Sequence, residues 1–295
     1  MTATRKATLL RIGSAVVALP IYAFTIVTDM LQATPILICS LVVTLACLYE
    51  FYRIADRGEG ERPFISWGMA AAVIINIVMY LFSFGKIYGY GRYLPSFDAR
   101  VVMAFLAIFL SAVLTFQLFA RPLKGATYSL GTTLLGLVYI VFSFAHIIPM
   151  KALANGVSYI IILNIVVMLN DSAAYFGGVL FGKHKTGFAA SPNKSWEGYF
   201  TGLLFGVLGI VIANQFCLSF LGQELFGFIE SVLVGTVLCI LGDIGDLVES
   251  AFKRDGSIKD SGSIVPGHGG MWDVFDALIF TMPLFYYYLL IRGLH

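Results

Sequence analysis

Residues 156–180 read GVSYIIILNIVVMLNDSAAYFGGVL, an apolar run long enough to cross a bilayer. A helix rises 1.5 Å per residue, so about 20 apolar residues span a hydrocarbon core of ~30 Å. Of the 295 residues, 59% are hydrophobic and 12% charged, and the mean hydropathy is +0.87. Soluble domains carry roughly 25% charged residues. The sequence therefore predicts an all-α, polytopic integral membrane protein with about nine transmembrane helices. The nine apolar segments are residues 8–28, 34–52, 65–85, 100–119, 126–146, 156–180, 198–219, 228–248 and 274–292.

The distribution of Lys and Arg predicts the orientation of these helices, because cytoplasmic loops are enriched in both. With the N-terminus in the cytoplasm and the C-terminus on the opposite side, fourteen of the 19 basic residues fall on the cytoplasmic side. These are Arg5, Lys6, Arg11, Arg53, Arg57, Arg62, Arg121, Lys124, Lys183, Lys185, Lys194, Lys253, Arg254 and Lys259. The other five are Lys86, Arg92, Arg100, Lys151 and Arg292.

The two halves of the chain differ in where their polar residues lie. Residues 1–150 place them in loops and are interpreted as an amino-terminal transmembrane bundle. Nearly all the unusual polar residues follow Asn155. Residues 151–295 are therefore interpreted as a carboxy-terminal catalytic transmembrane region with cytoplasmic active-site loops.

The first candidate segment is NDSAAYFGGVLFGKHKTGFAASPNKSWEGYFTG, residues 170–202. Asp171 lies inside an apolar helix, where a lone carboxylate costs about 2.5–3.5 kcal/mol. It needs a partner or a polar cavity, and a helix-packing hydrogen bond is the alternative. Ser195 is expected to cap the next helix, so Lys194 lies beside a helix N-terminus, a position suited to phosphate. Basic loop residues such as Lys183 and Lys185 are alternatively topology signals.

The second candidate segment is GDIGDLVESAFKRDGSIKDSGSIVPGHGGMWDVFDAL, residues 242–278. Asp243, Asp246 and Glu249 recur at i, i+3 and i+6, which places them on one helix face. Asp273 and Asp276 open the last helix, and the polar loop between the helices returns both ends to one membrane surface. Converging carboxylates repel unless cations neutralise them. Mg²⁺ prefers one or two carboxylates together with substrate phosphates.

Basic residues and glycines in the same segment support a metal–phosphate site. Lys253, Arg254 and Lys259 supply part of the positive charge. The run Pro266-Gly267-His268-Gly269-Gly270 forms a turn whose backbone amides can approach a phosphate. The alternative is a solvated, salt-bridged loop, with the aspartates favourable at a helix N-terminus.

Residues 250–276 closely resemble the signature of the phosphatidate cytidylyltransferases, also called CDP-diacylglycerol synthases. The segments DSAAYFGG, residues 171–178, and SPNKSWEG, residues 191–198, also resemble the family, so the similarity covers residue 164 to the C-terminus. The family pattern has Arg after the first aspartate of the last helix, where this chain has Val274. The matching positions of the signature are Ser250, Lys253, Arg254, Lys259, Asp260, Pro266, His268, Gly269, Gly270, Asp273 and Asp276.

The resemblance implies transfer of a cytidylyl group from CTP to phosphatidate, giving CDP-diacylglycerol and pyrophosphate. It implies Mg²⁺, as two divalent ions or one with a monovalent cation. It also implies a homodimer in a bacterial inner membrane, an active site facing the cytoplasm, and no nucleic-acid partner. The expected catalytic residues are Asp246, Asp273, Lys253, Arg254, Lys259 and Asp260. The expected substrate-binding residues are Lys194, Ser191, His268, Gly269, Gly270 and Asp171, and the expected metal ligands are Asp246, Asp273, Asp276 and Asp243.

Two alternatives remain open at this level. The intramembrane aspartates could serve a transporter or ion-coupled carrier, although the halves show no repeat of the kind many transporters carry. Val274 keeps open cytidylyl transfer to another lipid phosphate, such as that of an isoprenoid-derived ether lipid.

Overall fold

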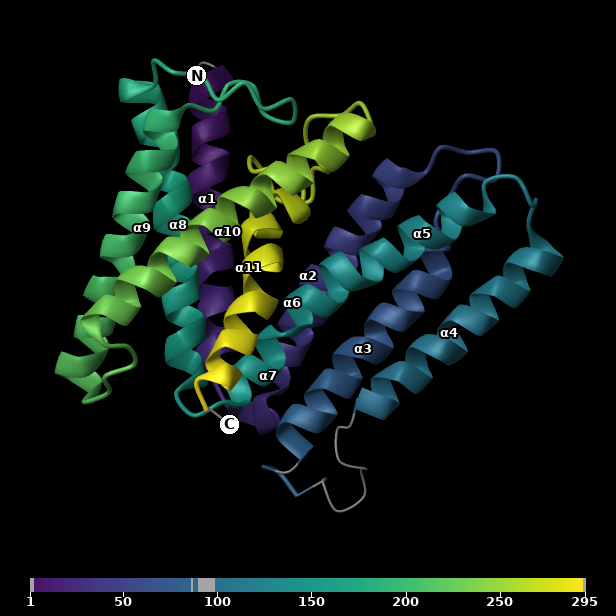
Figure 1. Ribbon diagram of the computed structural model, residues 1–295, viewed down its shortest axis with the longest axis horizontal. Coiled ribbons are helices and arrows are strands. Elements are labelled where there is room, and N and C mark those ends of the chain that lie inside the picture. Colours follow the sequence, from purple (N-terminus) through teal and green to yellow (C-terminus); the bar gives the residue numbers. More distant parts are fainter. Residues whose placement is uncertain (1–2, 86, 90–98, 294–295) are drawn as a thin grey trace. The chain divides into compact units, whose positions relative to one another are not determined.

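The computed structural model describes residues 3–85, 87–89 and 99–293, and the regular elements of these residues are helices (Figure 1). No β-strand occurs among them. The elements are α1 (Ala3–Val27), α2 (Met30–Ala55), α3 (Ile65–Gly85), α4 (Ala99–Ala120), α5 (Ala126–Gly136), the π-helix η2 (Leu137–Phe142), α6 (Ser143–Ala145), α7 (Ile147–Ala152), α8 (Gly156–Phe181), α9 (Trp196–Phe216), the π-helix η3 (Cys217–Leu221), α10 (Phe228–Asp255) and α11 (Trp272–Ile291).

Seven helices within the described residues are long and apolar enough to cross a membrane. A spanning helix satisfies its own backbone groups, which the bilayer leaves without water. The predicted class, an all-α polytopic integral membrane protein, is confirmed. The seven spans are Met30–Ala55, Ile65–Gly85, Ala126–Ala152, Gly156–Phe181, Trp196–Phe220, Phe228–Asp255 and Trp272–Ile291.

The other two predicted segments correspond to α1 and α4. Their apolar stretches in the described part of the chain are shorter, Gly13–Val27 and Ala104–Ala120. The count of nine spans and the orientation of the termini stay predictions. Lys86 and Arg92, two of the basic residues used for the orientation, lie outside the described residues.

Several helices extend beyond the predicted apolar segments, among them α10 and α11. The helix expected at 228–248 continues to Asp255, and the one expected at 274–292 begins at Trp272. Hydropathy marks only the apolar part of a helix. In α10 the last turn carries Lys253 and Arg254, cations that favour the carboxyl end of the helix dipole.

The chain forms two compact units, the first of which comprises Met1–Ala152 and Asp260–Val274. Inside this unit α2 packs on α3. The fully buried Asn76 of α3 accepts a hydrogen bond from Ser40 at 2.6 Å and donates one to Thr44 at 3.1 Å. A polar network thus joins the two helices. The segment from residue 260 to residue 274, which includes the start of α11, belongs to the same unit.

The second unit comprises Leu153–Lys259 and Phe275–His295. Here α8 packs along α9, and α9 along α10. A Cβ placed on Gly202 of α9 would lie 2.8 Å from Asn170 Oδ1 and 2.9 Å from Asn170 O, so the helix backbones approach closely. Ser195 caps α9, as predicted, by accepting a hydrogen bond from Gly198 N at 3.3 Å.

Substituting Gly202 tests this close packing. We expect Gly202→Ala to lower the free energy of unfolding by about 1–3 kcal/mol, because the methyl group overpacks the α8–α9 contact. Thermal unfolding in one detergent measures the change. Gly131→Ala is the matched control, since a Cβ there meets no atom within 4 Å. The control should be neutral or more stable by up to about 1 kcal/mol, and equal behaviour of both variants would contradict the prediction.

Candidate functional site

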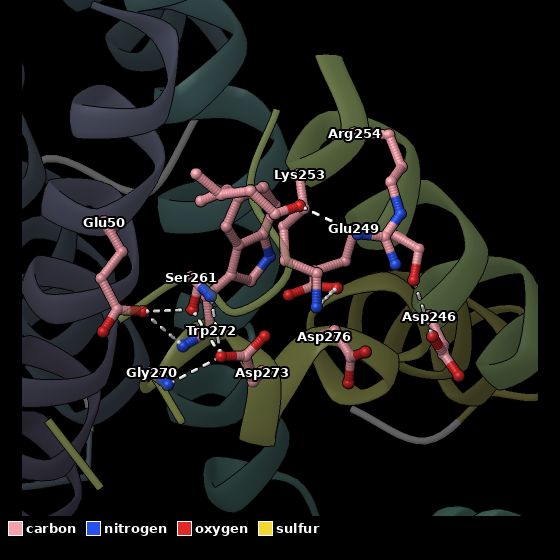
Figure 2. Close-up of polar contacts among 12 residues, drawn as sticks. Glu50, Asp246, Glu249, Lys253, Arg254, Ser261, Gly270, Trp272, Asp273 and Asp276 are labelled. Atoms are coloured by element: carbon pink, nitrogen blue, oxygen red, sulfur yellow. Dashed lines mark hydrogen bonds and ion pairs between the residues drawn. The ribbon is translucent and has the colours of Figure 1, made fainter. Parts of the chain in front are cut away.

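The second unit gathers acidic side chains at the carboxyl end of α10 and near the start of α11. Asp246 and Glu249 lie one turn apart on α10, and Asp276 comes from α11 (Figure 2). A ligand oxygen from each of the three lies within 4.8 Å of the other two. Three carboxylates at this spacing could hold a divalent cation, which takes oxygen ligands.

Two lysines contact this acidic group directly. Lys194 Nζ lies 2.5 Å from Asp246 Oδ2, and Lys253 Nζ lies 2.6 Å from Glu249 Oε2. The Glu249 side chain is 1% exposed, whereas that of Asp246 is 35% exposed. A buried carboxylate needs such a partner, because the charge has lost its water. The site therefore combines carboxylate oxygens that could hold a metal ion with cations that could bind phosphate.

Lys194 lies immediately before the N-cap of α9, where its charge is held by acidic neighbours. Burial by itself lowers its pKa, but the charge and hydrogen bond of Asp246, together with the charge of Asp243, outweigh burial and raise the pKa above 10.5. Lys194 is therefore a cation throughout the physiological range.

A second polar layer lies next to this group. Asn170 Nδ2 donates to Asp243 Oδ1 at 3.0 Å, which joins α8 to α10. Asp171 interacts electrostatically with Asp246, Asp243 and Lys194. Of these neighbours only Lys194 carries the opposite charge, whereas Asp246 and Asp243 repel an ionised Asp171. Lys194 is therefore the candidate for the partner that Asp171 was expected to need.

Other predicted residues of the second unit lie in or near its loops. Arg254 donates to Ile258 O at 3.0 Å, which closes the turn after α10. Lys259 is exposed, and Ser191 is half-buried and accepts a backbone hydrogen bond from Lys194 N at 3.3 Å.

The predicted residues of the segment 260–274 belong to the first unit. Asp273 Oδ2 accepts hydrogen bonds from Ser261 N at 2.9 Å, Ser261 Oγ at 3.0 Å and Gly270 N at 2.7 Å. The run from Pro266 to Gly270 is called the glycine turn below. Gly269 has φ +106, a backbone conformation that L side chains rarely adopt, so this turn requires glycine at that position. Asp260 is exposed.

The exposed His268 lies beside Ser14 of α1. Its Nδ1 is 3.1 Å from Ser14 Oγ, and that hydroxyl donates to Pro266 O at 2.9 Å. Both contacts are within the first unit, so α1 helps to hold the glycine turn.

The structure groups Asp246 and Asp276 with Glu249. The spacing had placed Glu249 on the face of Asp243 and Asp246, but the predicted metal ligands did not include it. Asp273 belongs to the first unit and Asp246 to the second, and a metal ion shared by these two stays a prediction.

Sequence reasoning missed Glu50. It lies inside the predicted segment 34–52 and is 3% exposed, so the interpretation that residues 1–150 keep their polar side chains in loops was wrong for this position. The signal was present, because a lone carboxylate inside an apolar run is as unusual here as at Asp171.

Residues 9–292 match the Cytidylyltransferase family, and the chain therefore belongs to that family. A phosphatidate cytidylyltransferase from Staphylococcus epidermidis is 39% identical over 151 residues, which are 51% of this chain and 55% of the relative. One from Bacillus subtilis is 40% identical over 160 residues, 54% of this chain and 58% of the relative. One from Staphylococcus aureus is 39% identical over 133 residues, 44% and 48%. The chain thus spans about half the length of these relatives.

Divalent cations should stabilise the folded protein through the acidic group. Binding to the folded state alone adds about 2.7 kcal/mol at a hundredfold excess over Kd. We expect Mn²⁺ to raise the melting temperature of the wild type and to raise that of Glu249→Gln much less. Glu224→Gln, an exposed carboxylate in a loop of the same unit, is the control and should keep the full rise. An equal rise in all three proteins would remove Glu249 from the cation site.

The Lys194–Asp246 pair predicts a pH effect on stability. Because the pKa of Lys194 is raised in the folded protein, the stabilisation is complete below pH 10.5 and is lost as pH rises through the raised value. The melting-temperature difference between wild type and Lys194→Met should be constant from about pH 7 to about pH 10 and should narrow at higher pH. The exposed Lys183 provides the control Lys183→Met. A difference that widens above pH 10.5 would contradict the assignment.

Proposed function

We propose that this protein transfers the cytidylyl group of CTP to phosphatidate, giving CDP-diacylglycerol and pyrophosphate for phospholipid biosynthesis. The observation that carries the proposal is the group formed by Asp246, Glu249 and Asp276 with Lys194 and Lys253 in contact. In a chain of the Cytidylyltransferase family, this combination suits a divalent cation and a triphosphate. Family membership favours a transferase over a transporter.

The proposed reaction requires positioning and charge neutralisation more than covalent chemistry from the protein. An oxygen of the lipid phosphate attacks the α-phosphorus of CTP. The bond from the α-phosphorus to its bridging oxygen breaks, and pyrophosphate leaves with the electron pair. Phosphatidate enters as a phosphate ester whose attacking oxygen carries no proton, so no general base is needed.

Mg²⁺, when bound, would neutralise negative charge on the phosphates of CTP. Asp246 and Asp276, with Glu249 added from the structure, would hold it. Asp273 remains a proposed ligand, and Asp243 a supporting one. The number of divalent ions bound per chain distinguishes a site with two divalent ions from a site with one divalent and one monovalent cation.

The remaining predicted residues would contact the substrates. Lys194 and Lys253 lie where phosphate could replace part of their carboxylate contacts. The glycine turn would shape the nucleotide pocket through its backbone amides. Arg254 and Lys259 are further proposed to bind phosphate. The proposed pocket residues are His268, Gly269, Gly270 and Ser191. Asp260 and Asp171 are proposed in supporting roles.

The proposed location follows from the substrates. CTP is dissolved in the cytoplasm and phosphatidate is anchored in a leaflet, so the site belongs at the cytoplasmic surface of a bacterial inner membrane. The positive charge of the loops supports this orientation. A homodimer is proposed from the family resemblance.

An activity assay tests the reaction. Purified protein in detergent receives CTP, phosphatidate and Mg²⁺, and both pyrophosphate and the lipid product are measured. We expect CDP-diacylglycerol to form, EDTA to abolish it, and Asp246→Asn to lower turnover at least about a hundredfold, because a charged metal ligand is lost. The control Glu224→Gln should retain turnover within about twofold.

A matched assay with an isoprenoid-derived ether lipid phosphate tests the acceptor. Val274 is 43% exposed and stands where the family pattern has Arg. Product from the ether lipid alone would overturn phosphatidate as acceptor. Absence of product from both lipids, with folded protein, would overturn the proposed reaction, and Val274→Arg would show whether this position accounts for the loss.

A further inference from the structure

The amino-terminal helices contribute one carboxylate that contacts the segment 260–274. Glu50 lies in the last turns of α2 within the span Met30–Ala55 and is 3% exposed. A carboxylate so placed is destabilising unless donors surround it. The donors to Glu50 therefore identify the segment that this carboxylate holds in place.

The hydrogen-bond donors to Glu50 come from a segment more than 200 residues away in sequence. Oε1 accepts from Met271 N at 2.9 Å. Oε2 accepts from Trp272 N and from Ser261 Oγ, each at 2.9 Å (Figure 2). Trp272 is the first residue of α11, where backbone N–H groups lack partners within the helix. Glu50 thus supplies the acceptor that the start of α11 needs.

The packing around this contact leaves little room for adjustment. A Cβ on Gly262 would lie 2.5 Å from Glu50 Oε1, and one on Gly270 would contact the Glu50 carboxylate and the Ser261 hydroxyl. The neighbouring Phe51 packs edge-on against the buried indole of Trp272, with ring centroids 5.5 Å apart. The backbone of the segment is therefore held directly against α2.

The same contact reaches Asp273 through Ser261. The Ser261 hydroxyl lies 2.9 Å from Glu50 Oε2 and 3.0 Å from Asp273 Oδ2, and Ser261 N and Gly270 N also donate to Asp273. A hydroxyl has one proton to donate, so the two carboxylates share it. Displacing Ser261 from Glu50 would disturb the two groups of Ser261, the hydroxyl and the backbone N–H, that donate to Asp273.

We infer that Glu50 is a positioning residue, which anchors the glycine turn and the start of α11 and thereby orients the Asp273 carboxylate. The link to catalysis rests on the proposed function. The anchoring itself rests only on contacts within the first unit.

Glu50→Gln is the sharpest test, because the side chain keeps its size. Met271 N–H faces one oxygen, while Trp272 N–H and the Ser261 hydroxyl face the other. In either orientation the new NH₂ group meets a backbone N–H, so a donor faces a donor. Glu50→Asp keeps both acceptors on a stem shorter by one methylene and is the conservative variant.

Asn76→Ala is the control for general destabilisation. Asn76 is a fully buried polar residue of α3 in the same unit, and its hydrogen bonds go to Ser40, Thr44 and Ala72. These partners belong to α2 and α3 and not to the segment 260–274. Its loss should lower the melting temperature without releasing that segment.

The experiment measures hydrogen–deuterium exchange and steady-state kinetics on the full-length protein in detergent. In Glu50→Gln, peptides covering residues 261–274 should exchange at least about tenfold faster and kcat should fall at least about tenfold. The Mg²⁺ concentration for half-maximal activity should rise, and Glu50→Asp should recover part of each effect. In Asn76→Ala, exchange of these peptides and kcat should stay within about twofold of the wild type.

Several outcomes decide the inference. The inference is overturned if residues 261–274 of Glu50→Gln exchange at the wild-type rate. It is also overturned if Asn76→Ala, at an equal drop in melting temperature, loses as much kcat as Glu50→Gln. Faster exchange of residues 261–274 in Glu50→Gln supports the anchoring even if the wild type makes no CDP-diacylglycerol. The missing product would then count against the proposed reaction alone. If Glu50→Gln does not fold, Ser261→Ala decides, since it removes only the shared hydroxyl. Unchanged exchange and kcat in Ser261→Ala then overturn the inference, and faster exchange with lower kcat supports it.

Discussion

Burying a carboxylate within a spanning helix carries a free-energy penalty that only hydrogen-bond donors or cations can offset. This constraint explains the polar architecture of both units. Glu50 and Glu249 are nearly inaccessible, at 3% and 1% exposure, and each is met by partners at hydrogen-bonding distance. The positions of the surrounding lysines, serines and backbone amides follow from that requirement.

The two units meet the requirement with different chemistry. In the first, Glu50 and Asp273 accept hydrogen bonds from backbone N–H groups and the Ser261 hydroxyl, which orders a loop without adding positive charge. In the second, Asp246 and Glu249 pair with Lys194 and Lys253. Hydrogen bonds to fixed amides favour rigidity, whereas lysines on flexible stems can be shared with an incoming phosphate. The hydrogen-bonded arrangement of the first unit therefore suits the ordering of a loop, and the lysine–carboxylate arrangement of the second unit suits the binding of phosphate.

Local pattern accounts for a defined part of the site. The i, i+3, i+6 spacing of Asp243, Asp246 and Glu249 correctly placed them on one face of α10, because a helix repeats every 3.6 residues. Ser195 was recognisable as a cap because its hydroxyl precedes an apolar run. Spacing along one helix does not say which of these carboxylates meets a carboxylate of another helix. Glu249 belongs to the metal-capable group because Asp276 of α11 lies beside it.

The sequence by itself determined the class of the protein and the kind of residues at its site. Apolar length predicts spanning helices because the bilayer has a fixed thickness, and the motif from Ser250 to Asp276 resembles one family because its spacing is long and specific. Only the tertiary structure decided which groups satisfy Glu50. Its donors are 211 to 222 residues away, and hydrogen bonding across such separations depends on how helices pack rather than on any local period.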